Sequence, residues 1–163
     1  MIHIVLLEPE IPQNTGNIIR SVAATGTRLH LIKPLGFSLE DKFLKRAGLD
    51  YFDLADVVIH ESIDDFWRYK GDAKIYYAST KAALRYDEAD YSGDVYVMFG
   101  RETKGLPEEL LAANYEKCVR IPMRKGLRSL NLSNSVAIIL YEALSQGDFE
   151  GLEEKGKLTK YDL

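Results

Sequence analysis

Short, almost continuous apolar runs alternate with segments of helical periodicity along most of this chain. These runs occupy residues 2–7, 28–32, 55–59, 73–78, 95–99 and 118–121. A strand that is apolar at nearly every position is buried on both faces, which is typical of a parallel sheet covered by helices. The alternation therefore predicts an α/β domain with a mostly parallel sheet.

The intervening segments predict helices whose ends carry ordinary capping residues. They cover residues 17–25, 39–47, 62–69 and 107–113, with Ser62 and Pro107 at starting positions and Gly26 and Gly48 at ends. The 163-residue chain is long enough for one sizeable core, and it contains no repeat or linker. We expect a single domain over residues 1–147, followed by a polar C-terminal tail over residues 148–163.

The last helix is apolar around more of its circumference than one buried face requires. It is expected to begin after Asn131, with Ser133 or Asn134 as its cap. The apolar stripe at helical spacing contains Val136, Ile139, Leu140, Ala143 and Leu144, and it is widened by Ala137 and Ile138. Two interpretations stay open: a second subunit covers the additional surface, or the helix is buried within one chain.

Charge is distributed unevenly along the chain, whose formal net charge is −4. Residues 17–46 carry six basic and two acidic side chains, and residues 117–128 carry five basic and no acidic ones. The remaining residues therefore have a net charge of −13. The overall charge argues against non-specific coating of nucleic acid, whereas the two basic segments are compatible with a local site for one structured RNA.

The number and spacing of cysteine and histidine residues predict the cellular compartment and whether the chain binds a metal. The single cysteine, Cys118, can form no internal disulfide and lies in a strand-like run, so we expect a buried side chain and a cytoplasmic protein. Neither a membrane span nor a signal peptide is predicted, and the Cys and His spacing indicates no metal site. His3, His30 and His60 are each expected to have a structural role.

Three loops that follow predicted strands carry unusual residues, and ligands bind at the carboxyl ends of parallel strands. In the first, residues 8–20, two prolines stiffen the chain, Gly16 is expected to permit a sharp turn, and a helix is expected to begin near Asn17. Asn17 and Arg20 would then share a face near a helix amino end, where Arg20 is suited to capturing a phosphate. The alternative is a capping residue followed by a solvated Arg.

The second loop, residues 99–107, has a glycine near each end, which lets the backbone approach a ligand closely. It matches neither the dinucleotide-binding glycine motif nor the Walker loop. The third loop, residues 121–134, carries three basic side chains and more hydroxyl and amide groups than a helix cap needs. Because these loops contain no histidine and no carboxylate pair of the kind that glycosidases use, their groups are suited to positioning a reactive cofactor and an anionic substrate.

Taken in order, the three loops resemble the TrmH-like, 2′-O-methylating branch of the SPOUT superfamily of RNA methyltransferases. The first matches the pattern Asn-x-Gly-Asn-x-x-Arg, the second Phe-Gly-x-Glu-x-x-Gly-Leu, and the third Ile-Pro-Met followed by Ser-Leu-Asn-x-Ser. The matching residues are Asn14, Gly16, Asn17 and Arg20; Phe99, Gly100, Glu102, Gly105 and Leu106; and Ile121, Pro122, Met123, Ser129, Leu130, Asn131 and Ser133. Residues 7–20 and the segment from Arg46 to Tyr51 are also similar to the minimal, TrmL-type members.

The resemblance implies a homodimer with a C-terminal trefoil knot and with S-adenosylmethionine bound in the knotted loops. A dimer would give the last helix a second partner. The cofactor-binding residues implied are Ala78, Gly100, Ile121, Ser129 and Leu130. The catalytic or positioning residues implied are Arg20, Asn17, Ser129 and Asn131, while Glu102 either orients Arg20 or, as we expect, holds its own loop.

TrmL-type members methylate the ribose of the wobble nucleotide, a cytidine or modified uridine at position 34, in leucine tRNAs. The resemblance therefore implies a cytoplasmic tRNA 2′-O-methyltransferase that contacts the anticodon stem-loop and needs neither metal nor membrane. Two alternatives stay open. One is an enzyme that acts on rRNA or on another tRNA position, and the other is a non-catalytic RNA-binding module.

Overall fold

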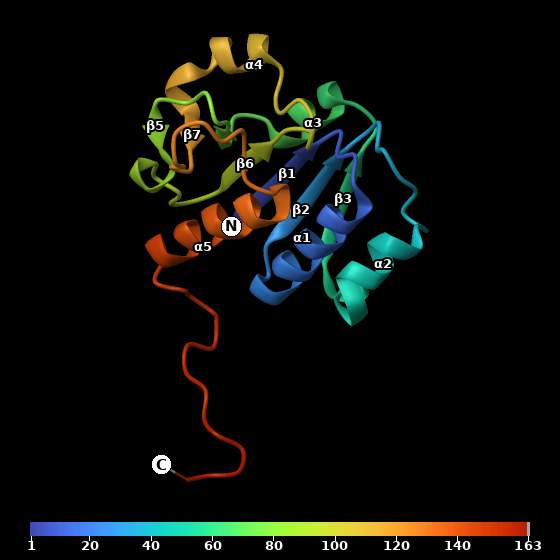
Figure 1. Cartoon of the computed structure of the whole chain (residues 1–163), viewed down its shortest axis with the longest axis vertical. Helices are drawn as coiled ribbons and strands as arrows, with labels where there is room; N and C mark the ends of the chain where they lie inside the picture. Colours follow the sequence, from blue (N-terminus) through green and yellow to red (C-terminus); the bar gives the residue numbers. More distant parts are fainter. Residues whose placement is uncertain (163) are drawn as a thin grey trace.

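The sheet is built from parallel strands (Figure 1). The computed structural model describes residues 1–162, without the side chains of residues 48–50. Within that part of the chain the strands are β1 (Ile2–Leu7), β2 (Arg28–Ile32), β3 (Asp56–His60), β4 (Lys74–Ala78), β5 (Leu84–Arg85), β6 (Val95–Phe99) and β7 (Cys118–Arg120). They lie in the order β3-β2-β1-β6-β4-β7-β5, and each neighbouring pair is parallel. The predicted fold class is confirmed, and the short β5 is the one described strand that was not predicted.

Helices cover both faces of the sheet (Figure 1). They are α1 (Pro12–Thr25), α2 (Lys42–Gly48), α3 (Ile63–Lys70), α4 (Glu108–Ala113) and α5 (Leu132–Gln146), with short 3-10 turns η1 (Leu49–Leu54), η2 (Tyr86–Glu88) and η3 (Tyr115–Lys117). Side chains of α1, α2 and α5 pack in one apolar core, and those of α3 and α4 pack in a second. The sheet is therefore buried on both sides, as its apolar strands predict.

The apolar residues of strand β1 pack in both cores. Ile4 and Leu6 pack on the side of α1 and α5, whereas Val5 and Leu7 pack on the side of α3. Successive side chains of a strand point to opposite faces, so a run that is apolar at every position is needed to fill both. The register pairs Ile4 with Leu29 of β2 and with Val97 of β6, which places β1 inside the sheet.

Cys118 is a buried part of the second core, as predicted. Its Sγ lies 3.4 Å from the carbonyl oxygen of Asn114. Burial raises the pKa of the Cys118 thiol, so the residue is a packed side chain and not an activated nucleophile.

The expected beginning of the first helix is wrong. Helix α1 begins at Pro12, five positions before Asn17, and Gly16 lies buried inside it instead of forming a sharp turn. Proline is well tolerated at the first helical position, because its fixed φ suits the helix and its missing N–H would have no partner there. The helix ends as predicted, since Gly26 has φ 68° and its N–H donates to the carbonyl of Val22.

The second helix also begins later than expected, at Lys42 and not at residue 39. The Asp41 carboxylate accepts hydrogen bonds from the N–H groups of Phe43 at 2.8 Å and Leu44 at 3.4 Å. An acidic side chain that accepts from the first free N–H groups marks a helix start. This capping role of Asp41 was not predicted from the sequence.

Helix α5 is capped by Asn131, which corrects the expectation of Ser133 or Asn134. Val136, Ile139, Leu140 and Ala143 are buried within the chain. Ile138 and Tyr141, in contrast, are 36% and 48% exposed. Burial within one chain therefore accounts for one face of this helix and leaves apolar and aromatic groups on its outer face.

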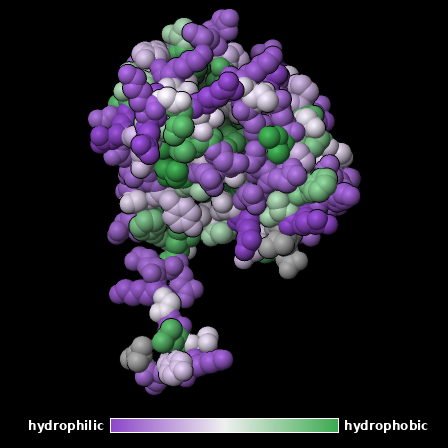
Figure 2. Space-filling model, viewed as in Figure 1, coloured by the Kyte–Doolittle hydropathy of each residue, from purple (hydrophilic) through white to green (hydrophobic). Residues whose placement is uncertain are grey.

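The chain continues beyond α5 as a hydrophilic tail that projects from the domain (Figures 1 and 2). A turn closes the helix, in which the Phe149 N–H donates to the carbonyl of Leu144 at 2.9 Å. The expected trefoil knot stays a prediction. In residues 1–162 no helix combines the length and hydropathy needed to cross a membrane.

The three histidines form a buried chain of hydrogen bonds, which could not be predicted because the residues are far apart in the sequence. His3 Nδ1 lies 2.9 Å from His30 Nε2, and His30 Nδ1 lies 2.9 Å from His60 Nε2. At one end, His3 Nε2 lies 2.8 Å from a carboxylate oxygen of Asp94. Because that carboxylate can only accept, His3 carries its proton on Nε2, which makes His30 and His60 donate from Nε2 in turn.

Burial lowers the pKa of all three histidines. For His30 it lowers the pKa to about 3, and the neighbouring His3, His60 and Arg28 act in the same direction. Desolvation outweighs Asp94, which acts to raise the pKa of His3, and it also lowers the pKa of His60. The rings are packed against Phe66, Tyr69 and Tyr96. The folded protein therefore holds the three rings neutral, which supports the expected structural role.

We expect the free energy of unfolding to fall as the pH is lowered from about 7.5 to about 5. The unfolded histidines bind protons below about pH 6.5, whereas the lowered pKa of each folded histidine makes it bind protons less readily, so acid favours the unfolded state. For His30 alone the loss amounts to about 2 kcal/mol at about pH 5. Urea unfolding at both pH values measures it, and His30→Gln should reduce the dependence. Equal stability of the wild type at the two pH values would contradict this account.

Candidate active site

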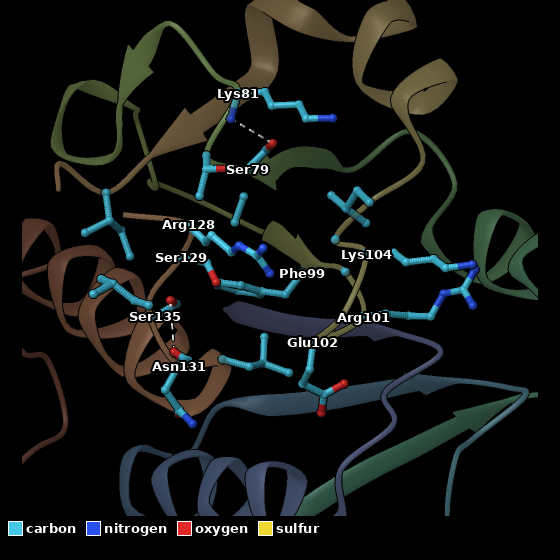
Figure 3. Close-up of a pocket in the computed structure, with 18 of the residues that line it drawn as sticks. Ser79, Lys81, Phe99, Arg101, Glu102, Lys104, Arg128, Ser129, Asn131 and Ser135 are labelled. Carbon is cyan, nitrogen blue, oxygen red and sulfur yellow. Dashed lines mark hydrogen bonds between the residues drawn. The ribbon is translucent and has the colours of Figure 1, made fainter. Parts of the chain in front are cut away.

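A cavity of about 690 Å³ lies at the carboxyl ends of β4, β6 and β7 (Figure 3). Its walls come from the loops that follow these strands and from the amino end of α5. All five predicted cofactor residues line it, together with Asn131: Ala78, Gly100, Ile121, Ser129 and Leu130. Asn17 and Arg20 are not among the lining residues. The structure thus brings the second and third loops together around one space and places the two α1 residues outside it.

The second loop can close only because position 100 is glycine. A Cβ there would lie 2.1 Å from the carbonyl carbon of Gly105 and 2.2 Å from the backbone nitrogen of Leu106. The loop turns back on itself, with the Gly105 N–H donating to the Arg101 carbonyl at 2.8 Å. Gly105 makes this return possible with φ 66°, a conformation that other residues rarely adopt.

Glu102 joins the second loop to the amino end of α1. Its carboxylate accepts from the backbone N–H of Glu10 at 2.8 Å and of Ile11 at 3.0 Å. In return, Glu10 accepts from the Thr103 hydroxyl at 2.7 Å and from the Thr103 N–H at 3.2 Å, and these bonds lower the pKa of Glu10. Glu102 therefore has a structural role, but its hydrogen bonds hold the first loop and not, as we expected, its own.

Asn131 joins the third loop to the first. Its Oδ1 caps α5 by accepting from the N–H groups of Ser133 at 2.9 Å and Asn134 at 3.2 Å. Its Nδ2 donates to Oδ1 of Asn14 at 3.0 Å, and Nδ2 of Asn14 lies 3.4 Å from Glu102. Asn14 thus links all three loops. The residue belongs to the first-loop motif, but this linking role was not predicted from the sequence.

Arg20 and Asn17 lie on the exposed face of α1. The expected position near the helix amino end is wrong, because α1 begins at Pro12 and both residues lie beyond its first turn. The dipole of α1 therefore gives Arg20 little help with an anion, since that effect is confined to the first turn. The Arg20 guanidinium carbon instead lies 5.4 Å from the ring centroid of Tyr51.

Four cationic side chains lie around the cavity, and the sequence indicated only one of them. They are Lys81, Arg101, Lys104 and Arg128 (Figure 3). Lys81 pairs with Glu108 at 3.0 Å and Arg101 with Glu8 at 3.4 Å, whereas Lys104 and Arg128 form no ion pair with any described residue. The basic third loop was the available signal for Arg128. For Lys81 the signal was its position just after a strand end.

The cavity suits an organic ligand with both apolar and polar parts. Its volume is within the range of about 300–1,000 Å³ that is typical of small-molecule sites. Apolar side chains such as Phe99, Leu106 and Ile121 line it beside polar groups such as Ser129. S-adenosylmethionine, which has an aromatic base, a ribose and a charged amino-acid part, matches this mixture of lining groups.

Comparison with known proteins places these features in a family. The model of the SpoU rRNA Methylase family matches residues 1–141. A tRNA (cytidine(34)-2'-O)-methyltransferase from Methylovorus glucosotrophus (strain SIP3-4) is 54% identical over 153 residues, which cover 93% of this chain and 99% of the relative. A protein of the same name from Saccharophagus degradans is 48% identical over 152 residues, covering 93% and 99%.

Solved structures agree with this result. One solved structure, described as "Structural insights into the 2-OH methylation of C/U34 on tRNA", superposes with a TM-score of 0.87 and is 43% identical in sequence. The match covers 92% of this chain and 98% of the solved one. An AdoMet-bound rRNA methyltransferase from Sinorhizobium meliloti has a TM-score of 0.80 and 26% identity, covering 88% and 56%. The resemblance seen in the three loops is confirmed over most of the chain, and this protein belongs to the SpoU rRNA methylase family.

Proposed function

We propose that the protein transfers a methyl group from S-adenosylmethionine to the ribose 2′-hydroxyl of nucleotide 34 in tRNA. Relatives with about half of their residues identical over nearly the whole chain carry this activity in their names. The observation that carries the proposal is the convergence of the five cofactor positions on one cavity. The similarity to TrmL-type members favours a cytidine or modified uridine in leucine tRNAs, and hence action in the cytoplasm.

The chain fits the cofactor through the cavity described above. When bound, S-adenosylmethionine supplies an electrophilic methyl group on a sulfonium. We assign its binding to Ala78, which ends β4, and to Gly100, Ile121, Ser129 and Leu130, which lie in the loops that follow β6 and β7. The chain's own task is to hold the 2′-hydroxyl in line with that group and to help remove its proton.

Arg20 is the proposed organiser of the RNA. Its planar guanidinium is suited to binding the phosphate next to the target ribose with two parallel hydrogen bonds. Since a guanidinium keeps its protons, the phosphate and not Arg20 is the proposed acceptor of the hydroxyl proton. We assign the positioning of the ribose or of Arg20 to Asn17, Ser129 and Asn131.

We further propose that two copies of the chain form a homodimer and that Arg20 acts in the partner's site. The exposed Ile138 and Tyr141 on α5 favour such an interface, because a second copy would cover them. The outer face of α5 lies on the side of the sheet that also carries α1 (Figure 1). The position of Arg20 outside the cavity of its own chain favours the second part of the proposal.

We propose residues 1–147 as the methyltransferase domain and residues 148–163 as a polar tail. The family match ends at residue 141, and α5 ends at Gln146. Beyond the turn after α5, the described residues up to 162 form no helix or strand. The end of α5 and of the family match close to residue 147 supports this boundary.

The function is tested with purified protein, labelled S-adenosylmethionine and leucine tRNA transcripts. We expect one methyl group per tRNA, mapped to the ribose of nucleotide 34. The matched control is the same tRNA with a 2′-deoxyribose at that position, which should accept none. Methylation of rRNA or of another tRNA position would show that the assigned substrate is wrong. Absence of both methyl transfer and cofactor binding would favour the alternative of a non-catalytic RNA-binding module.

A further inference from the structure

The segment from Arg46 to Tyr51 resembles TrmL-type members but plays no part in the proposed site so far. It spans the end of α2 and the beginning of η1, and both elements pack against α1. Through this packing Tyr51, which is 36% exposed, lies against Arg20 of α1. The distance from the Arg20 guanidinium carbon to the ring centroid is 5.4 Å.

A cation at this distance is attracted to the face of an aromatic ring. The interaction uses the charge of the guanidinium but none of its N–H groups, so this contact leaves all five donors for another partner. Two other arginines of this chain are bound differently. Arg28 donates to Asp56 at 2.6 Å and to Tyr69 at 3.1 Å, and Arg101 pairs with Glu8 at 3.4 Å.

Arg20 therefore differs from these arginines in a way that matters for an anion. Among the residues whose side chains the structure describes, which leave out residues 48–50, the Arg20 guanidinium contacts the Tyr51 ring and forms no hydrogen bond or ion pair. A carboxylate would neutralise the charge and occupy the N–H edge that a phosphate needs. An aromatic face restricts the side chain while leaving that edge free.

We propose that Tyr51 is a positioning residue that holds the Arg20 guanidinium ready for the RNA phosphate. This inference rests on the proposed function of Arg20 in methyl transfer. Tyr51 acts through Arg20 and is not assigned a contact with the substrate. Its ring is the active part, so the hydroxyl should be dispensable.

The chain offers a matched control for this proposal. Phe43 in α2 is 40% exposed, and the Lys42 ammonium lies 5.2 Å from its ring centroid. It is thus a second exposed aromatic residue in a cation–π contact on the neighbouring helix. Phe43 has no assigned part in the site, so its replacement reports on the general effect of removing such a ring.

The experiment compares Tyr51→Leu, Tyr51→Phe and Phe43→Leu with the wild type, using tRNA methylation at saturating S-adenosylmethionine. We expect Tyr51→Leu to lower kcat by about fivefold or more, because a misplaced group costs rate even when binding persists. Tyr51→Phe should stay within about twofold of the wild type, since it keeps the ring face. Phe43→Leu should match the wild type, and all variants should keep their affinity for the cofactor.

A double-mutant cycle separates positioning from a general structural effect. On an Arg20→Ala background, Tyr51→Leu should cause no further loss in single-turnover rate, because the group that Tyr51 holds is gone. An unchanged kcat for Tyr51→Leu, a Tyr51→Phe variant as slow as Tyr51→Leu, or additive losses in the cycle would each overturn the proposal. Failure of the wild type to methylate tRNA would instead overturn the proposed function.

Discussion

Arg20→Ala is expected to lower the rate of methyl transfer to tRNA by about 10²- to 10³-fold, the usual effect of removing one group that organises the transition state. The affinity for S-adenosylmethionine should not change, because Arg20 does not line the cavity. Stability should change by less than about 0.5 kcal/mol, since the side chain is exposed. Single-turnover kinetics, calorimetric titration and thermal unfolding measure the three quantities.

The salt dependence of tRNA binding gives a further check on this variant. A side chain that contacts one phosphate contributes about one unit to the slope of log K against log salt concentration, and the variant should lose that unit. Arg20→Lys keeps the charge but not the paired donors, so it should bind tRNA better than it methylates it. Full activity of Arg20→Ala would remove this residue from the mechanism.

Gly100→Ala is expected to abolish measurable S-adenosylmethionine binding. The added Cβ would lie 2.1 Å from the Gly105 carbonyl carbon, so the second loop must open and the cavity wall that it forms must move. Forcing a methyl group into a packed backbone contact also costs about 1–3 kcal/mol of stability. Calorimetric titration of the cofactor and urea unfolding measure the two effects.

The matched control for this variant is Gly156→Ala in the tail. A Cβ at Gly156 would meet no atom within 4 Å, so this variant should bind the cofactor and unfold like the wild type. Cofactor binding by a folded Gly100→Ala protein would show that the closed second loop is not needed for the site. A protein that loses binding together with its fold is distinguished by its unfolding curve.

Together the two variants test which protomer of the proposed homodimer supplies Arg20. Mixed dimers would pair a chain that has Arg20 but no cofactor site with a chain that has the cofactor site but no Arg20. If Arg20 acts across the dimer, one of the two sites is complete and activity returns on mixing. If Arg20 acts within its own chain, both sites are incomplete and the mixture stays inactive.

The sequence predicted the strands well, because the constraint on them is local. Residues buried on both faces must be apolar at each position, and the predicted run of residues 95–99 coincides with β6. The beginning of α1 could not be found in the same way. Gly16 is unfavourable inside a helix, and the amino end of this helix is held by Glu102, which lies far along the chain.

The contacts within the site could not be predicted from the sequence either, because they join residues that are far apart along the chain. Motifs identify residue types, so the resemblance selected Gly100 and Ser129 as cofactor residues, and both line the cavity. They do not identify partners. The contact of Arg20 with Tyr51 and the chain of three histidines join residues about thirty positions apart, and only the folded chain brings them together.

The link from Glu102 through Asn14 to Asn131 has a consequence for how the protein is made. These hydrogen bonds join residues separated by 88 and 117 positions. A nascent chain on the ribosome therefore lacks the last anchor of its first loop until Asn131 has left the exit tunnel. The amino-terminal half cannot hold the site in its final shape by itself, so the enzyme becomes competent at the end of synthesis and not in stages.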